Sequence, residues 1–298
     1  MERKENDRKS VLMILSSMLI FGTIGIFRRY IPLSSAFLAF SRGILGGLFI
    51  LAFVRLKRGK AEERLPVRTV IWLAATGAVM GINWILLFEA YNHTTVAVAT
   101  LCYYMQPTIV VLLSPLIFRE RLTGKKAVCA AVAIAGMVLV SGVIGGGEAQ
   151  AGSLQGILLG LGAAVFYSGV VIMNKRISGI DAYQKTIIQL LAAGAVMIPY
   201  LLLTNGFSSE GVSTRTVILL LVVGLVHTGI AYVLYFGSMD GLKVQSVAIF
   251  SYIDPVSALL FSAIFLKEPL SALGIIGAVM IIGSAVISEI QTLGGNNG

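Results

Sequence analysis

The fold is indicated by a stretch of 24 residues that recurs, in related form, 148 residues further along the chain. Residues 100–123 read TLCYYMQPTIVVLLSPLIFRERLT, and residues 248–271 read AIFSYIDPVSALLFSAIFLKEPLS. Six aligned positions are identical, namely the pairs Tyr104 and Tyr252, Pro107 and Pro255, Leu112 and Leu260, Ser114 and Ser262, Glu120 and Glu268, and Leu122 and Leu270. Each copy is a long apolar run with a proline in its first half, so the pattern predicts a duplicated set of apolar helices.

The composition of the whole chain predicts that these runs lie in a membrane. Of the 298 residues, 57% are hydrophobic and 12% are charged, whereas an ordinary soluble domain has about 25% charged residues. This composition excludes a soluble enzyme, a disordered chain and a disulfide scaffold. The two cysteines, Cys102 and Cys129, lie inside apolar runs without metal-binding spacing, so we expect free buried thiols.

Apolar runs long enough to span a membrane occur ten times along the chain. A bilayer core about 30 Å thick requires roughly 20 apolar residues per helix. The runs cover residues 11–28, 34–54, 69–89, 95–118, 126–145, 154–173, 185–204, 216–236, 242–266 and 272–290. The sequence therefore predicts an all-α polytopic membrane protein with ten transmembrane helices.

The basic residues indicate how these helices are oriented. If the N-terminus is cytoplasmic, 18 of the 23 Lys and Arg residues fall in cytoplasmic segments and 4 fall in external loops. This bias follows the positive-inside rule, so we expect both termini in the cytoplasm. The net charge of +9 is spread in short clusters between helices and forms no single basic face, so we expect no nucleic-acid partner.

The offset of 148 residues divides the chain into two repeats, residues 1–148 with the first five helices and residues 149–298 with the last five. Because five is an odd number, the second repeat enters the membrane from the opposite side, and the repeats are inverted. Inverted repeats are typical of secondary transporters, in which the substrate site lies near the midplane and is exposed to alternate sides.

Two polar residues lie at the centres of the duplicated helices, Asp254 in one repeat and its counterpart Gln106 in the other. Polar groups in hydrocarbon are costly and mark functional sites. We expect both to bind substrate, with Asp254 taking an amino group or carrying a coupling proton; a structural pairing of Asp254 with Arg42 is the alternative. Pro107 and Pro255 are predicted to kink their helices and to free a carbonyl one turn earlier.

Aromatic residues from both repeats are candidates for the wall of a cavity. Trp84 aligns with Tyr232, and Tyr103 lies three residues before Gln106. Such rings hold an apolar side chain or, through their π faces, a cationic headgroup. Ordinary packing of membrane aromatics is the alternative.

Further polar residues lie within or at the ends of the predicted helices. Asn83 is a candidate substrate contact and His227 a candidate proton carrier, with packing roles as alternatives. Arg42, about nine residues into the second helix, is interpreted as a structural anchor, with a substrate carboxylate as the alternative partner. Glu120 and Glu268 lie at equivalent helix ends, where we expect structural roles.

Several of these stretches resemble a known family. Residues 99–107, ATLCYYMQP, and residues 118–123, FRERLT, look like the fourth helix of EamA-type transporters. Residues 251–255, SYIDP, and 266–271, LKEPLS, are similar to the ninth helix, and residues 41–43, SRG, fit the second. The chain thus resembles the EamA family of the drug/metabolite transporter superfamily over nearly its whole length. The resemblance implies a cavity lined mainly by helices 1, 3, 4, 6, 8 and 9.

These observations predict a secondary transporter that moves a small organic metabolite, an amino acid or a related amine, by alternating access, with the proton as candidate coupling ion. Transport of quaternary or other organic cations is the alternative, and an intramembrane enzyme is a remote one. We expect no enzymatic activity, cofactor or metal. The expected partners are the small-molecule substrate and the lipid bilayer, in the cytoplasmic membrane of a bacterium.

Overall fold

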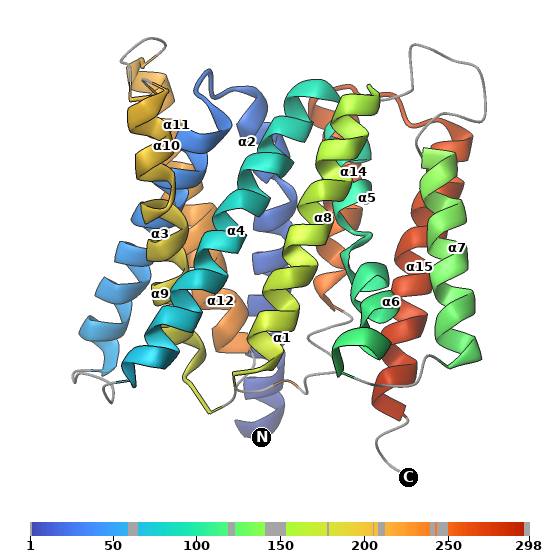
Figure 1. Ribbon diagram of the computed structural model, residues 1–298, viewed down its shortest axis with the longest axis horizontal. Helices are drawn as coiled ribbons and strands as arrows, with labels where there is room; N and C mark the ends of the chain where they lie inside the picture. The colour runs from blue at the N-terminus through green and yellow to red at the C-terminus, as the bar shows by residue number, and fades with distance from the viewer. Residues whose placement is uncertain are drawn as a thin grey trace.

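The computed structural model shows a bundle of helices that run side by side between the two ends of the molecule (Figure 1). It describes residues 2–58, 65–118, 123–140, 153–177, 179–204, 206–207, 212–238, 242 and 250–294. Within these residues every regular element is a helix, which confirms the predicted all-α class. The start of α1 and the end of α15 lie at the same end of the bundle (Figure 1).

The helices follow the apolar pattern of the sequence. Their bounds are α1 Glu2–Gly22, α2 Ile24–Arg29, α3 Ser35–Arg58, α4 Val67–His93, α5 Val96–Tyr103, α6 Gln106–Phe118, α7 Gly124–Val140, α8 Leu154–Lys175, α9 Ala182–Ala195, α10 Met197–Leu203, α11 Thr214–Leu221, η1 Val222–Ile230, α12 Ala231–Ser238, α14 Ile253–Phe265 and α15 Ala272–Gly294. Each of the ten predicted runs overlaps at least one of these helices.

The length and hydropathy of these helices fit a membrane protein. Within the described parts of the chain, seven stretches are long and apolar enough to cross a membrane. Two shorter apolar helices, Ile253–Phe265 and Ala272–Ile287, come after them in the chain. The protein is therefore an all-helical polytopic membrane protein.

Helix breaks occur beside Pro107 and Pro255, where the sequence predicts kinks. α5 ends at Tyr103, and α6 begins at Gln106, directly before Pro107. α14 begins at Ile253, two residues before Pro255. A proline has no N–H donor and is tolerated in the first turn of a helix, where that donor has no partner within the helix. The structure thus has a helix end at each position instead of one bent helix.

The segment between α11 and α12 is wound as a π-helix, η1. Such segments are rare and frequently occur at functional sites. η1 packs against α3, where the missing side chain of Gly46 leaves room for Thr228. This contact fixes Thr228 beside the middle of α3.

Glycines permit the closest contacts between helices. α7 packs along α15, where a Cβ atom on Gly277 would lie 2.5 Å from the carbonyl oxygen of Gly136. α3 packs along α9, where a Cβ atom on Gly43 would lie 2.7 Å from the backbone nitrogen of Gly194. Small residues let helix backbones approach closely, which stabilises helix pairs in a membrane.

Candidate functional site

A cavity of about 510 Å³ lies inside the bundle, a volume typical of small-molecule sites. Its deep end is formed by the buried residues Gly25 and Thr100, and its other end reaches the exposed Lys175 at the end of α8. In Figure 1 that end of α8 lies at the same end of the bundle as the start of α1. The cavity therefore opens toward the end of the molecule where α1 begins and α15 ends.

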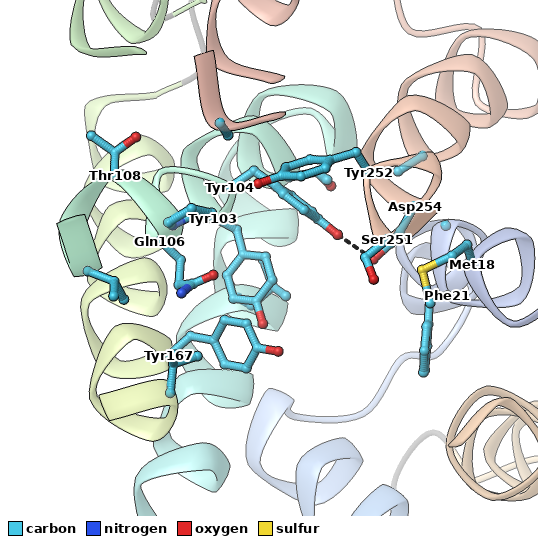
Figure 2. A pocket seen from close by; sticks show the side chains of 18 of the residues that line it. Met18, Phe21, Tyr103, Tyr104, Gln106, Thr108, Tyr167, Ser251, Tyr252 and Asp254 are labelled. Carbon is cyan, nitrogen blue, oxygen red and sulfur yellow. Dashed lines mark hydrogen bonds between the residues drawn. The ribbon is translucent and has the colours of Figure 1, made fainter. Parts of the chain in front are cut away.

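The acidic part of the cavity wall is Asp254, in the first turn of α14. The hydroxyl of Tyr104 donates a hydrogen bond of 2.6 Å to Oδ2 of Asp254 (Figure 2). The partial positive charge at the N-terminus of α14 also favours a carboxylate at this position. The two helix breaks thus place a hydrogen-bonded acid inside the cavity.

The aromatic part of the wall comes from several helices. Tyr103 of α5 stacks on Tyr167 of α8 with ring centroids 5.2 Å apart, and Figure 2 shows these two rings beside Gln106. Tyr232 of α12 meets Phe21 of α1 edge to face at 5.3 Å. These rings, together with Gln106, offer apolar faces and scattered polar groups, the usual surface of a site for a small organic molecule.

Arg42 lies on the cavity wall and is only 6% exposed. Its Nε donates a hydrogen bond of 2.9 Å to the hydroxyl of Thr228 on η1. The centre of its guanidinium lies 4.3 Å from the ring centroid of Trp84, which is a cation–π contact. The pairing of Arg42 with Asp254 is not among the ion pairs that the structure describes.

Five residues predicted to bind substrate lie together on the cavity wall, namely Asp254, Gln106, Trp84, Tyr103 and Tyr232, and Pro107 and Arg42 line the same cavity. Other candidates are held elsewhere. Asn83 is fully buried, and its amide donates a hydrogen bond of 2.6 Å to the carbonyl of Ala163 on α8. Pro255 is buried in α14.

His227 lies in η1 and is 2% exposed. Its Nε2 lies 2.8 Å from the hydroxyl of Thr23, and its ring packs edge to face on Phe27 at 4.6 Å. These contacts place His227 between η1 and the junction of α1 and α2, not among the described residues that line the cavity.

Glu268 belongs to a polar cluster at the deep end of the cavity, which we name the Glu268 cluster (Arg29, Thr94, Val96, Ala97 and Glu268). The Glu268 carboxylate accepts hydrogen bonds from the backbone nitrogens of Val96, at 3.0 Å, and Ala97, at 3.4 Å. Arg29 lies 3.3 Å from the same carboxylate and donates a hydrogen bond of 2.6 Å to the carbonyl of Thr94. The cluster thus joins α2, the start of α5 and the segment after α14. Its counterpart Glu120 lies outside the described residues.

Several cavity residues were not among the sequence candidates. Tyr104, Tyr167 and Tyr235 line the cavity, as do Lys126 and Lys175. Tyr104 had a usable signal, because it is identical in the two repeats, whereas Tyr167 aligns with Leu19. Within the described residues, no group of three or more His, Cys, Asp or Glu side chains is placed to hold a metal ion.

Comparison with known proteins identifies the class of protein. The model of the EamA-like transporter family matches residues 8–142 and, separately, residues 154–289. With its apolar helices, this match defines the protein as a membrane transporter. The chain belongs to the EamA-like transporter family, and with it to the drug/metabolite transporter superfamily.

Several relatives are similar along most of the chain. The uncharacterized transporter YxxF of Bacillus subtilis is 28% identical over 97% of this chain and 92% of its own. Protein PecM of Dickeya dadantii is 26% identical over 76% of each chain. Protein RarD of Salmonella typhimurium is 24% identical over 88% of this chain and 87% of its own. A protein crystal structure with 21% identity shares the fold at a TM-score of 0.65, covering 95% of this chain and 98% of that chain.

Proposed function

We propose that the protein is a secondary transporter that moves an amino acid or a related amine across the cytoplasmic membrane by alternating access. The observation that carries this proposal is the cavity, which holds the Asp254 carboxylate among tyrosine side chains and opens toward one end of the bundle. A carboxylate held in this way accepts hydrogen bonds from an ammonium group. Gln106 and the rings of Trp84, Tyr103 and Tyr232 complete the proposed substrate site.

The helix contacts support two inverted repeats, residues 1–148 and 149–298. At the offset of 148 residues, α4 aligns with the continuous helical stretch of α11, η1 and α12, and α1 aligns with α8. The contact between α4 and α8 then corresponds to the contact between α12 and α1, and the contact of α4 with α9 to that of η1 with α3. Related pairs, α7 with α15 and α3 with α9, also pack together. The double match of the family model fits the same division.

The proposed orientation of the transporter rests on the basic residues. If the chain crosses the membrane ten times, 18 Lys and Arg residues lie on one side and 4 on the other, and the positive-inside rule favours both termini in the cytoplasm. The cavity then opens toward the cytoplasm. In this arrangement the Glu268 cluster closes the outer end, and alternating access requires its hydrogen bonds to break.

The proton is the proposed coupling ion, and Asp254 is its proposed carrier. A carboxylate in a cavity that opens to alternate sides can bind a proton on one side and release it on the other. Asp254 is the only carboxylate among the described residues that line the cavity. His227, with its contacts to Thr23 and Phe27, lies outside this path.

Organic cations are a second candidate class of substrate, favoured by the number of aromatic rings in the cavity wall. Trp84, Tyr103, Tyr167 and Tyr232 all line the cavity, and the π faces of such rings bind cationic headgroups. A quaternary ammonium group has no N–H to donate to Asp254, so the binding of this group depends on these rings and on charge.

A thermal-shift screen of the purified protein tests the proposed function. A ligand that binds the folded state raises the apparent melting temperature. We expect stabilisation by amino acids or primary amines, and its loss in Asp254→Asn. Asp181→Asn is the matched control, because Asp181 caps α9, outside the cavity. Stabilisation that is unchanged in Asp254→Asn would contradict the assignment, and stabilisation by choline alone would favour the second class.

A further inference from the structure

We infer that Arg42, held against the face of Trp84, forms the binding site for a carboxylate, so that the transported amine is a zwitterion such as an α-amino acid. This inference rests on the proposed function, in which Asp254 takes the amino group. It assigns to Arg42 a direct contact with the substrate in place of the structural role predicted from the sequence.

The first argument is the burial of the Arg42 charge without an anionic group in hydrogen-bond or ion-pair contact among the described residues. Asp254 attracts it only from beyond ion-pair distance. Arg42 is 6% exposed, lies on the cavity wall, and is the eighth residue of α3. Its described contacts are the Thr228 hydroxyl and the rings of Trp84 and Phe88. A buried charge is costly unless it is paired. An anionic group that enters the cavity supplies the missing pair.

The second argument is the fixed geometry of the guanidinium. The hydrogen bond to Thr228 uses Nε alone. Thr228 is itself held by a hydrogen bond of 3.1 Å to the carbonyl of Val223, and its side chain packs where Gly46 leaves space on α3. Trp84 supports the flat face of the guanidinium at 4.3 Å. The planar fork of an arginine matches both oxygens of a carboxylate, and a fork fixed in advance loses little freedom on binding.

The third argument is the charge of the cavity wall. Among the described lining residues, Arg42, Lys126 and Lys175 are basic, whereas Asp254 is acidic. A cavity with this excess of positive charge attracts a ligand that carries an anionic group. A permanent cation without a carboxylate pairs only with Asp254 and leaves Arg42 uncompensated. A zwitterion provides one charge for each residue.

The test compares ligands that share a side chain and an amino group and differ in whether they carry a carboxylate, by titration calorimetry on the purified full-length protein. The probes are phenylalanine, phenylalanine methyl ester and phenethylamine, with leucine, leucine methyl ester and isoamylamine as a second set. In the wild type we expect the amino acid to bind about 10- to 100-fold more tightly than its ester or amine, the effect of a charged hydrogen-bonded pair. We expect Arg42→Gln to remove this difference, and Arg42→Lys, which keeps the charge without the planar fork, to leave part of it.

The outcomes separate this inference from the proposed function. The carboxylate site would be overturned if the wild type bound the amino acid and its methyl ester with equal affinity. It would also be overturned if Arg42→Gln weakened the binding of the amino acid and of the simple amine equally. If phenethylamine bound Asp254→Asn as tightly as the wild type, the amine site at Asp254 would be overturned. The carboxylate site would then be judged from the Arg42 variants alone. Failure of all six probes to bind would overturn both. If Arg42→Gln does not fold, the comparison of acid with ester in the wild type decides the question.

Discussion

The Tyr104 hydroxyl donates a 2.6 Å hydrogen bond to Oδ2 of Asp254, and this contact joins two helix breaks that come from different halves of the chain. Tyr104 comes directly after the last residue of α5, and Asp254 is the second residue of α14. The bond therefore depends on both breaks, and it orients the carboxylate that we propose as the amine site.

Replacement of Tyr104 with phenylalanine keeps the ring and removes this donor. We expect Tyr104→Phe to lower the free energy of unfolding by about 0.5–2 kcal/mol, the range for hydrogen bonds between membrane helices. Because Asp254 loses its fixed orientation, amine binding is also expected to weaken. Thermal unfolding in detergent and ligand-induced shifts in melting temperature measure the two effects.

Tyr103→Phe is the control for that substitution. Tyr103 lies next to Tyr104 on the cavity wall, and its described contacts are through its ring, with Tyr104 and Tyr167. Its ring contacts survive the change, so we expect a smaller loss of stability. Equal effects of the two substitutions would contradict a special role for the Tyr104 hydroxyl.

The close packing of α7 on α15 predicts opposite effects for two glycine substitutions on the same helix. A Cβ atom at Gly277 would lie 2.5 Å from the carbonyl oxygen of Gly136, whereas a Cβ atom at Gly283 would have no neighbour within 4 Å among the described atoms. We expect Gly277→Ala to destabilise the protein by about 1–3 kcal/mol through overpacking. Gly283→Ala should stabilise it by up to about 1 kcal/mol through helix propensity. Equal melting temperatures for the two variants would show that the helices do not pack as described.

The Glu268 cluster predicts a change in access to the cavity from outside. Glu268→Gln removes the charge that Arg29 and the start of α5 contact, and such charged hydrogen bonds contribute about 1.5–3 kcal/mol each. We therefore expect about tenfold faster modification of Thr100→Cys by an impermeant maleimide added to whole cells, in a background with both native cysteines replaced by serine. Asp181→Asn in the same background is the control, because Asp181 caps α9 at the other end of the bundle. Equal labelling rates in all three proteins would exclude a closing role for Glu268.

Proton coupling at Asp254 predicts a response to a pH gradient. In proteoliposomes, a gradient should accelerate amino-acid uptake by the wild type. It should not restore uptake by Asp254→Asn, because an amide neither holds the ammonium group of the substrate as a carboxylate does nor binds and releases the proton. Measurement of uptake at several gradients tests the proposal, and a variant that responds as the wild type does would exclude Asp254 as the carrier.

The order of the helices was predictable because hydrocarbon requires long apolar runs, and each predicted run overlaps a helix. The positions of the helix breaks beside Pro107 and Pro255 were predictable, but the number of residues that leave the helix there was not. Sequence patterns do not specify how far the chain unwinds around a proline, because the neighbouring helices decide which freed backbone groups find partners. The π-helix at Val222–Ile230 has no such marker, since that stretch contains no proline.

The cavity residues were predictable in part. Asp254 and Gln106 were identified by their polarity in hydrocarbon, and both line the cavity. Asn83 and Trp84 are neighbours on α4, yet Trp84 lines the cavity and Asn83 contacts α8. Consecutive helical residues point about 100° apart, and a helix that is apolar on all sides gives no signal as to which face meets the cavity. The partners of Arg42 are likewise set by tertiary packing.

The most direct test of the proposed transport is counterflow in proteoliposomes. Vesicles that contain the purified protein are loaded with a mixture of unlabelled amino acids, and the same mixture in radiolabelled form is added outside at low concentration. We predict transient accumulation of label by the wild type and by Asp181→Asn, and none by Asp254→Asn or by protein-free vesicles. Accumulation by Asp254→Asn equal to that by the wild type, or no accumulation by the wild type above protein-free vesicles, would contradict the proposed transport.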